Sequence, residues 1–391
     1  MNIERPLEGL RVLDLSQGIA GPHCGGLFAE YGARVIKIEP TTGDWMRTLG
    51  PGYDNRSAGF IYYNRGKKSL ALDLKADGAS EIVRTLAESC DVFIENNRPG
   101  VSDRLGIGFD TIRARQQHII YISISGFGQY GPDAANPLSD TVAQAHSGMM
   151  MINRGRADAP ASIGTTIVDA VSGLYAFQAA IMALWVPEGR RQARHLDISL
   201  SQAAAAIQGP KILEYGIVGS MPNKLNPPAG SYATADGWIA LTLVRETDWQ
   251  RLCRALGREE LASMPEFETF QARANNLIAL TGILDETIKL KTTKTWSAHF
   301  ARAGVLASPI NDYGDWLAHR QTHATQGAPR LNVGQPGLGP VPRTPGLEPY
   351  AEPCPRLGQH SRSVLEEAGF DCEIVTRLIT TGSVVALDFA E

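Results

Sequence analysis

The chain has 391 residues, of which 43% are hydrophobic and 20% are charged, and its formal net charge at pH 7 is -4. This length exceeds one ordinary core, so we expect two domains, or one large domain with an insertion. The weakly acidic charge argues against nucleic-acid binding, which needs a basic stripe, and the lack of a run of about 18 apolar residues argues against a membrane span. We therefore expect small molecules as partners.

The five cysteines are scattered along the chain, and none has a histidine or a second cysteine at the spacing of a metal site. We expect reduced thiols and no bound metal. The first residues carry acids and arginines and lack the apolar stretch of a secretory signal, which favours a cytoplasmic location.

Strand and helix patterns alternate in the first part of the chain. Short runs rich in Val, Ile and Leu predict strands over Arg11–Ser16, Ala33–Glu39, Asp91–Asn96 and Ile119–Ser125, and an amphipathic helix is predicted over Ala79–Cys90. This alternation predicts an α/β fold with a mostly parallel, doubly wound sheet. Ligands of such sheets bind beyond the carboxyl ends of the strands, where Gln17, Asn96, Asn97 and the loop 125–128 are expected.

The stretch LDLSQGIAGPHCGG, residues 13–26, connects the first strand to a helix through several glycines. The glycines stand at positions 18, 21, 25 and 26, so the dinucleotide-binding pattern G-x-G-x-x-G does not fit them. Glu39 nevertheless stands about twenty residues further on, where an acid could bind a ribose. A Rossmann-type dehydrogenase therefore stays open as an alternative.

A different organisation begins after about Ser220. The stretch 236–257 predicts a strand followed by an amphipathic helix, and the stretch 293–312 predicts a helix, a tight turn and a strand, which together indicate a second, smaller α/β unit. Residues 326–359 are dense in proline and glycine, and a helix is predicted to follow over His360–Phe370. We expect this segment to run in an extended path that returns to the first unit.

Asp169 is the one charged residue in the apolar helical stretch 161–186. A carboxylate without partners in apolar surroundings is costly, so either a specific contact holds it or its pKa rises. It could simply cap a helix that begins near Ala170. It could also be a nucleophile, and the two interpretations are compatible.

Longer stretches carry a combined pattern: PLEGLRVLDLSQGIAGP, YGARVIKIEP followed by GDWMR, NRGKKSLALDLK, DVFIENNRPGVSDRLGIGFDTI, IIYISISGFGQYGP, AQAHSGMM, IVDAVSGLYA, GVLASPIN and PRLGQHSRSVLEEAGF. Together they resemble the class III CoA-transferases, the superfamily of formyl-CoA transferase, carnitine CoA-transferase and α-methylacyl-CoA racemase. The resemblance covers nearly the whole chain. It implies a large Rossmann-like CoA-binding domain over 1–200, completed by the returning residues 330–391, a linker over 201–224 and a small domain over 225–325.

The implied activity moves CoA from an acyl-CoA donor to a carboxylic acid acceptor, with Asp169 as the nucleophile of an aspartyl anhydride and thioester intermediate. CoA thioesters are then substrates, and no cofactor is required. The resemblance assigns CoA and substrate contacts to Gln17, Ile19, Ala20, Leu72, Lys75, Asn96, Asn97, Arg98, Arg104, Ser139, Asp140 and Gly230. Ile19 departs from the family, whose transferases often carry glutamine there, and Gln17 is near enough to replace it.

An acyl-CoA racemase of the same superfamily is the alternative function, and a non-catalytic acyl-CoA-binding protein also stays open. The racemase branch places a histidine base before the aspartate, where this chain has Ser139 before Asp140, and serine cannot abstract a proton α to a thioester. The transferase is therefore favoured. Gly230 stands where some members carry a glycine-rich loop over the intermediate, and the family further implies a homodimer of two interlocked rings.

Overall fold

A computed structural model of the chain describes residues 5–154, 159–187, 190–221, 226–330, 339–350 and 352–387. The chain forms two compact units, one of residues Met1–Leu213 and Gln326–Glu391 and the other of Glu214–Thr325. The stretch 201–224, predicted as a linker, includes most of helix α9 (Leu200–Ile207) and all of α10 (Gly209–Val218). Its residues 222–224 lie outside the described residues.

The first unit is built on a central sheet in which seven strands are described, in the order β12-β5-β2-β1-β6-β7-β8. Their bounds are β1 Arg11–Asp14, β2 Arg34–Glu39, β5 Lys68–Leu72, β6 Val92–Glu95, β7 Ile120–Ser125, β8 Arg194–Ser199 and β12 Val384–Val385. Every described neighbouring pair is parallel except β12 and β5. The predicted α/β fold with a mainly parallel sheet is thus confirmed, and the strand order reverses between β1 and β6.

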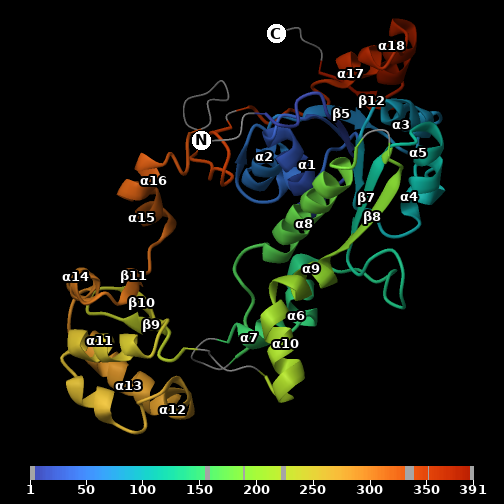
Figure 1. The fold of residues 1–391 in the computed structure, drawn as a ribbon. Helices are drawn as coiled ribbons and strands as arrows, with labels where there is room; N and C mark the ends of the chain where they lie inside the picture. Colours follow the sequence, from blue (N-terminus) through green and yellow to red (C-terminus); the bar gives the residue numbers. More distant parts are fainter. Residues whose placement is uncertain are drawn as a thin grey trace. The chain divides into compact units, whose positions relative to one another are not determined.

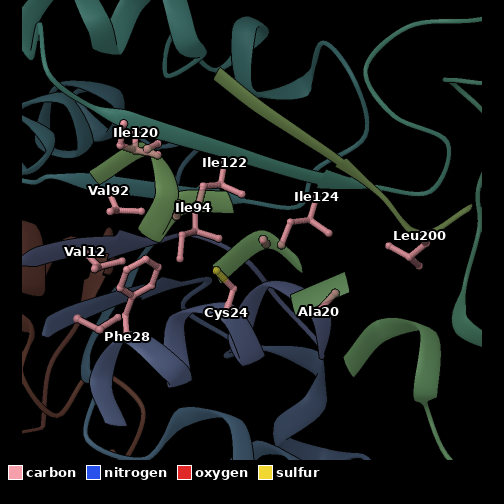
Figure 2. Close-up of a cluster of buried hydrophobic side chains, with 14 of the residues drawn as sticks. Val12, Ala20, Cys24, Phe28, Val92, Ile94, Ile120, Ile122, Ile124 and Leu200 are labelled. Carbon is pink, nitrogen blue, oxygen red and sulfur yellow. The ribbon is translucent and has the colours of Figure 1, made fainter. Parts of the chain in front are cut away.

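One face of this sheet packs on helices α1 (Ala20–Glu30), α6 (Asp140–His146), α8 (Ile167–Leu184) and α9. Figure 2 shows the cluster between them, in which Val12, Val92 and the alternating Ile120, Ile122 and Ile124 meet side chains of α1. Helix α8 lies alongside α1 (Figure 1). The strict alternation along β7 follows from the two-residue period of a strand.

The strand residues that alternate with these point to the other face of the sheet and belong to a second hydrophobic cluster. Leu13, Phe93 and Tyr121 pack there against α3 (Ala79–Glu88), α5 (Phe109–Arg115), α17 (Ser361–Glu367) and α18 (Cys372–Thr380). Helices α17 and α18, drawn in red in Figure 1, therefore belong to the first unit although they end the chain. Both sheet faces are covered, which explains why every residue of β6 and β7 is buried.

Shorter elements complete the first unit. They are the hairpin β3 (Gly52–Tyr53) and β4 (Arg56–Ser57), the 3₁₀ helix η1 (Trp45–Thr48), α2 (Ala58–Asn64), α4 (Val101–Arg104) and α7 (Met149–Ile152). The proline-rich return path contacts β5 and the segment before it: Pro353 O accepts from Gly66 N at 2.9 Å, and Ser69 Oγ accepts from Gly358 N at 2.9 Å. These contacts tie the end of the chain to the edge of the sheet.

Helix α8 is apolar and long enough to cross a membrane by length and composition, and among the described residues it is the single helix that meets this criterion. Buried helices of domain cores meet it equally well. Val168, Ala176 and Ala180 of α8 are fully buried against α1 and the sheet. One face of α8 therefore belongs to the core of the first unit, whereas 33% of its apolar window is buried in all.

The second unit has its own sheet, of order β11-β10-β9 in the described residues, and its own core. Its elements are β9 (Gly230–Ala233), β10 (Trp238–Thr242), α11 (Thr247–Leu256), η3 (Glu259–Ser263), α12 (Phe270–Asn275), α13 (Leu277–Ile288), α14 (Thr293–Ala303), β11 (Leu306–Pro309), α15 (Tyr313–Ala318) and α16 (Arg320–Ala324). Trp249 and Trp296 are almost fully buried at its centre. The strand-to-helix and helix-to-strand patterns of the sequence appear here as β10 with α11 and as α14 with β11.

Candidate active site

A cavity of about 480 Å³ lies at the carboxyl ends of β1, β6 and β7, beside the point where the strand order reverses. The residues that line it are Gln17, Ile19, Ala20, Trp45, Asn96, Asn97, Arg98, Pro99, Ile124, Ser125, Gly126, Ala134, Asn136, Pro137, Leu138, Ser139, Asp169 and Leu200. Ala20, Ile124 and Leu200 also belong to the buried cluster and lie together at the right of Figure 2. The hydrophobic core therefore forms one wall of the cavity.

The loop after β1 enters the cavity through paired contacts with the loop after β6. Gln17 N donates to Asn96 Oδ1 at 2.9 Å, and Asn96 Nδ2 donates back to Gln17 O at 2.7 Å. In the described structure no hydrogen bond is made by the side-chain amide of Gln17, which lines the cavity. A polar donor and acceptor is thus available next to any bound group.

The glycines of this loop have two different roles. Gly18 has φ +80°, a left-handed conformation that favours glycine, and so allows the tight turn from the strand. Gly25 instead lets α1 approach a buried ion pair, because a Cβ there would lie 2.5 Å from Asp14 Oδ2 and 3.0 Å from Lys67 Nζ. The glycine run therefore serves the packing of α1 on the protein as well as the turn.

Asp169 reaches the cavity from the first turn of α8, which begins at Ile167, before the predicted start near Ala170. The cause is a contact from α6: Asp140 Oδ2 accepts from Val168 N at 2.7 Å and from Asp169 N at 3.1 Å. Thr166, at the N-cap position, makes no side-chain capping bond. Asp140 thus satisfies the first amides of α8 from outside the helix.

Burial raises the pKa of Asp169 to about 7, and the neighbouring Asp140 carboxylate adds to the effect. Asp140 is itself buried, and Gln144 Nε2 donates to its Oδ1 at 2.6 Å. Gln144 in turn accepts from Ile163 N at 2.8 Å, which connects it to the segment before α8. Two carboxylates in one buried site, one held by amide donors and the other exposed to the cavity, are a pattern found at functional sites.

The remaining residues assigned by resemblance lie in different places. Ser139 lines the cavity directly before α6, and Arg98 lines it with an exposed side chain. Leu72 is fully buried in β5 as part of the core, and Lys75 and Arg104 are exposed and do not line the cavity. Gly230 belongs to β9 of the second unit.

Several lining residues were not singled out from the sequence. Trp45 is 54% exposed and lines the cavity from η1, and Leu138 and Leu200 add to its apolar wall. Trp45 stands in the quoted stretch GDWMR, so a signal was present, but an exposed tryptophan in a turn does not by itself indicate a site. Among the described lining residues, Asp169 is the single carboxylate and Arg98 the single cation.

The family model for CoA-transferase family III matches residues 7–361. The chain belongs to this family. Two relatives carry names that agree with it: succinyl-CoA:glutarate CoA-transferase of Homo sapiens is 31% identical over 98% of this chain and 91% of its own, and acetyl-CoA:oxalate CoA-transferase of Acetobacter aceti is 31% identical over 93% and 95%. This family III CoA-transferase therefore has named relatives that use acyl-CoA and small carboxylic acids.

A solved structure agrees with this membership. The CAIB/BAIF family protein from Brucella suis superposes with a TM-score of 0.82 at 30% identity, and the match covers 94% of this chain and all of the other. A family III CoA-transferase fold with a mainly parallel central sheet is thus shared along nearly the whole chain.

Proposed function

We propose that this enzyme transfers CoA from an acyl-CoA donor to a small carboxylic acid through a covalent intermediate on Asp169. The observation that carries the proposal is the position of Asp169, which is the sole carboxylate among the described residues lining the cavity. The other described lining residues offer amides, hydroxyls, apolar groups and the Arg98 guanidinium, and the neighbouring Asp140 carboxylate does not line the cavity. A nucleophile for thioester chemistry is expected in such a setting.

The proposed reaction balances without any external oxidant or metal. An Asp169 carboxylate oxygen attacks the donor thioester carbonyl, and the C–S bond breaks. CoA leaves as a thiolate, and the acyl group stays on Asp169 as a mixed anhydride. The thiolate then attacks the Asp169 carbonyl, which releases the donor acid and forms an aspartyl-CoA thioester. The acceptor carboxylate attacks this thioester, and the returning thiolate attacks the acyl carbon of the second anhydride, giving the new acyl-CoA and free Asp169.

Each of these steps develops negative charge on a carbonyl oxygen, which needs a hydrogen-bond donor. Ile19 has no donor, whereas the amide of Gln17 lines the same cavity and makes no described side-chain hydrogen bond. We assign the oxyanion role to Gln17. Gly230 would supply a backbone N–H to cover the intermediate and exclude water, which would otherwise hydrolyse the anhydride.

We further propose that Asn97, Arg98 and the exposed Lys75 and Arg104 bind the phosphates of CoA, since arginine and lysine suit phosphate groups. Leu72 is buried, so its contribution would come from its main chain. The acceptor is expected to be a small acid of the kind that the named relatives use, glutarate or oxalate. A panel of donors and acceptors, with mass spectrometry of the acyl-CoA products, identifies the pair.

Racemisation is less well supported than transfer. Ser139 stands at the position of the racemase base, and no histidine is among the described residues that line the cavity. His146 is exposed at the end of α6, where its ring meets Phe127 with 5.0 Å between the centroids.

The decisive experiment replaces Asp169 by asparagine. We expect Asp169→Asn to lose transfer while it keeps CoA binding, because only the nucleophilic oxygen is removed. Hydroxylamine added during turnover with donor should trap Asp169 as a hydroxamate, visible as a mass change on its peptide. Asp110→Asn, at an exposed acid of α5, is the matched control. Clear residual transfer by Asp169→Asn, or an unmodified Asp169 peptide, contradicts the covalent route.

We also propose a homodimer of interlocked subunits. Helix α10 has no buried residue among those described, and Leu213, Ile217 and Val218 are 65%, 77% and 65% exposed. Exposed apolar side chains gathered on one helix are expected to be covered by another chain, here a second copy. If the subunits are interlocked, two differently tagged preparations should not exchange subunits over hours, whereas co-expression should give mixed dimers. Rapid exchange, or a folded monomer at nanomolar concentration, argues against interlocking.

A further inference from the structure

Two walls of the cavity are attached to one buried aspartate. Gly18 N, in the loop between Gln17 and Ile19, donates to Asp44 Oδ1 and Oδ2 at 3.1 and 3.2 Å. Met46 N, in the turn that carries Trp45, donates to Asp44 Oδ1 at 2.9 Å. Asp44 does not line the cavity and is 2% exposed. Asp44 therefore connects the loop of Gln17 and the turn of Trp45 without itself lining the cavity.

A buried lysine contacts both Asp44 and the same loop. Lys37 Nζ lies 2.9 Å from Asp44 Oδ2 and donates to Ser16 O at 2.7 Å. Burial alone would lower the pKa of Lys37, but Asp44 and two other buried carboxylates raise it above its usual value. The lysine thus stays charged, and the pair holds the carbonyl of residue 16 and the amide of residue 18 at the same time.

The two walls also contact each other. A Cβ on Gly18 would lie 2.3 Å from Cζ2 of Trp45, so the indole rests directly on the backbone of the loop. A displacement of either segment must therefore move the other. Because Trp45 and Gln17 both line the cavity with Asp169, a shift at Asp44 changes the position of substrate relative to the nucleophile.

A buried ion pair of this kind is weak evidence for a stabilising role, because apolar replacements of buried pairs are often neutral or better. We propose that Asp44 and Lys37 are the positioning pair of this active site, which holds Gln17 and Trp45 in the geometry needed at Asp169. This inference rests on the proposed function, since it assumes that substrate binds between these walls. Neither residue touches substrate, so the expected effect is on turnover rather than on binding.

Two double variants distinguish the positioning of the loop by Asp44 from the effect of burying the two charges. Lys37→Met with Asp44→Asn removes both charges and keeps an oxygen that can accept from Gly18 N. Lys37→Met with Asp44→Ala removes both charges and that acceptor. We expect the alanine variant to lose about 10- to 100-fold in kcat with KM for the donor changed by less than about 3-fold, because small misplacements cost rates of this size. The asparagine variant should restore most of kcat.

A control and a second perturbation exclude general destabilisation. Glu30→Gln removes the charge of a different buried pair, with Arg65, at the opposite end of α1 from the cavity-lining Ala20. Neither residue of this pair lines the cavity, so the variant should leave kcat unchanged even if Tm falls. Gly18→Ala should push Trp45 away and lower kcat as the alanine double variant does, which gives a result if that variant does not fold.

Equal kcat in the two double variants, or a Gly18→Ala enzyme with the kcat of the wild type, overturns the inference while the proposed function stands. The proposed function is judged separately, on wild-type transfer and the Asp169→Asn variant. If the wild-type enzyme transfers no CoA with any donor and acceptor pair, the positioning inference falls with it.

Discussion

Replacing Asp140 by asparagine should move the acid limb of the pH–rate profile to lower pH without removing the proposed nucleophile, Asp169. The Asp140 carboxylate lies against the start of α8, with its Oδ2 at 3.1 Å from Asp169 N, and its charge helps to raise the pKa of Asp169. Asparagine keeps an oxygen for the amides of α8 but carries no charge. The pKa of Asp169 should therefore fall, and the carboxylate should be ionised at lower pH.

The size of the fall in the Asp169 pKa follows from the relative weight of its two causes, burial and the Asp140 charge. Burial contributes more than Asp140 to the rise of the Asp169 pKa from 3.8 to about 7. Removal of the charge should then lower that pKa by less than half of this rise. The expected fall of the pKa is roughly 1 to 1.5. At pH 6, a pKa lowered by about 1 raises the ionised fraction of Asp169 by about fivefold. Burial keeps the pKa above its usual value in the variant as well.

The substitution also has a structural cost. Gln144 Nε2 donates to Asp140 Oδ1, so the new amide nitrogen would face a donor on that side. One lost hydrogen bond of this kind costs about 1 kcal/mol, and the plateau rate should fall moderately. The informative quantity is therefore the position of the acid limb rather than the maximum rate.

The assay is kcat/KM for the acyl-CoA donor from pH 5 to 9, since this parameter reports groups of the free enzyme. Asp77→Asn, at an exposed acid that does not line the cavity, is the control for a change of net charge. An acid limb that stays in place in Asp140→Asn, or that moves to higher pH, would refute the reasoning, because the limb would then not belong to an Asp169 coupled to Asp140.

Further outcomes are expected from the same structure. The folded state raises the pKa of Asp169 above its unfolded value, so wild-type stability should fall as pH rises from about 4 to about 7, and Asp169→Asn should lack this loss. Denaturant titrations at pH 5 and 8 should therefore show the variant gaining roughly 2 to 4 kcal/mol relative to wild type, and an equal difference at both pH values contradicts the shift. Gly25→Ala should lower the free energy of unfolding by about 1 to 3 kcal/mol, because its Cβ would overlap Asp14 Oδ2, and an unchanged Tm would show that α1 can move. Arg104→Ala should raise KM for the donor far more than it lowers kcat, since a contact with a distant phosphate stabilises ground and transition states alike, and equal losses in both would place Arg104 near the reacting atoms.

The sheet of the first unit could be predicted from the sequence because its signals are local. The run Ile119–Ser125 is apolar at every core position, and the observed strand β7 covers Ile120–Ser125 with all its residues buried. Bounding turn residues and intervening amphipathic helices then leave few alternatives to a parallel sheet. The positions of loops at the carboxyl ends of such strands follow from the topology, so the sequence alone places Gln17, Asn96 and Ser125 near one another, as the cavity lining has them.

The sequence by itself therefore determined the fold class, the place of the candidate site at the strand ends and the unusual isolation of Asp169. Only the tertiary structure decided how that carboxylate is held, because Asp140 and Asp169 are 29 residues apart and their contact depends on the packing of α6 on α8. The same holds for Asp44, whose contact with Gly18 spans 26 residues. Propensity and periodicity describe neighbours along the chain, whereas pKa values and loop positions depend on groups that folding alone brings together.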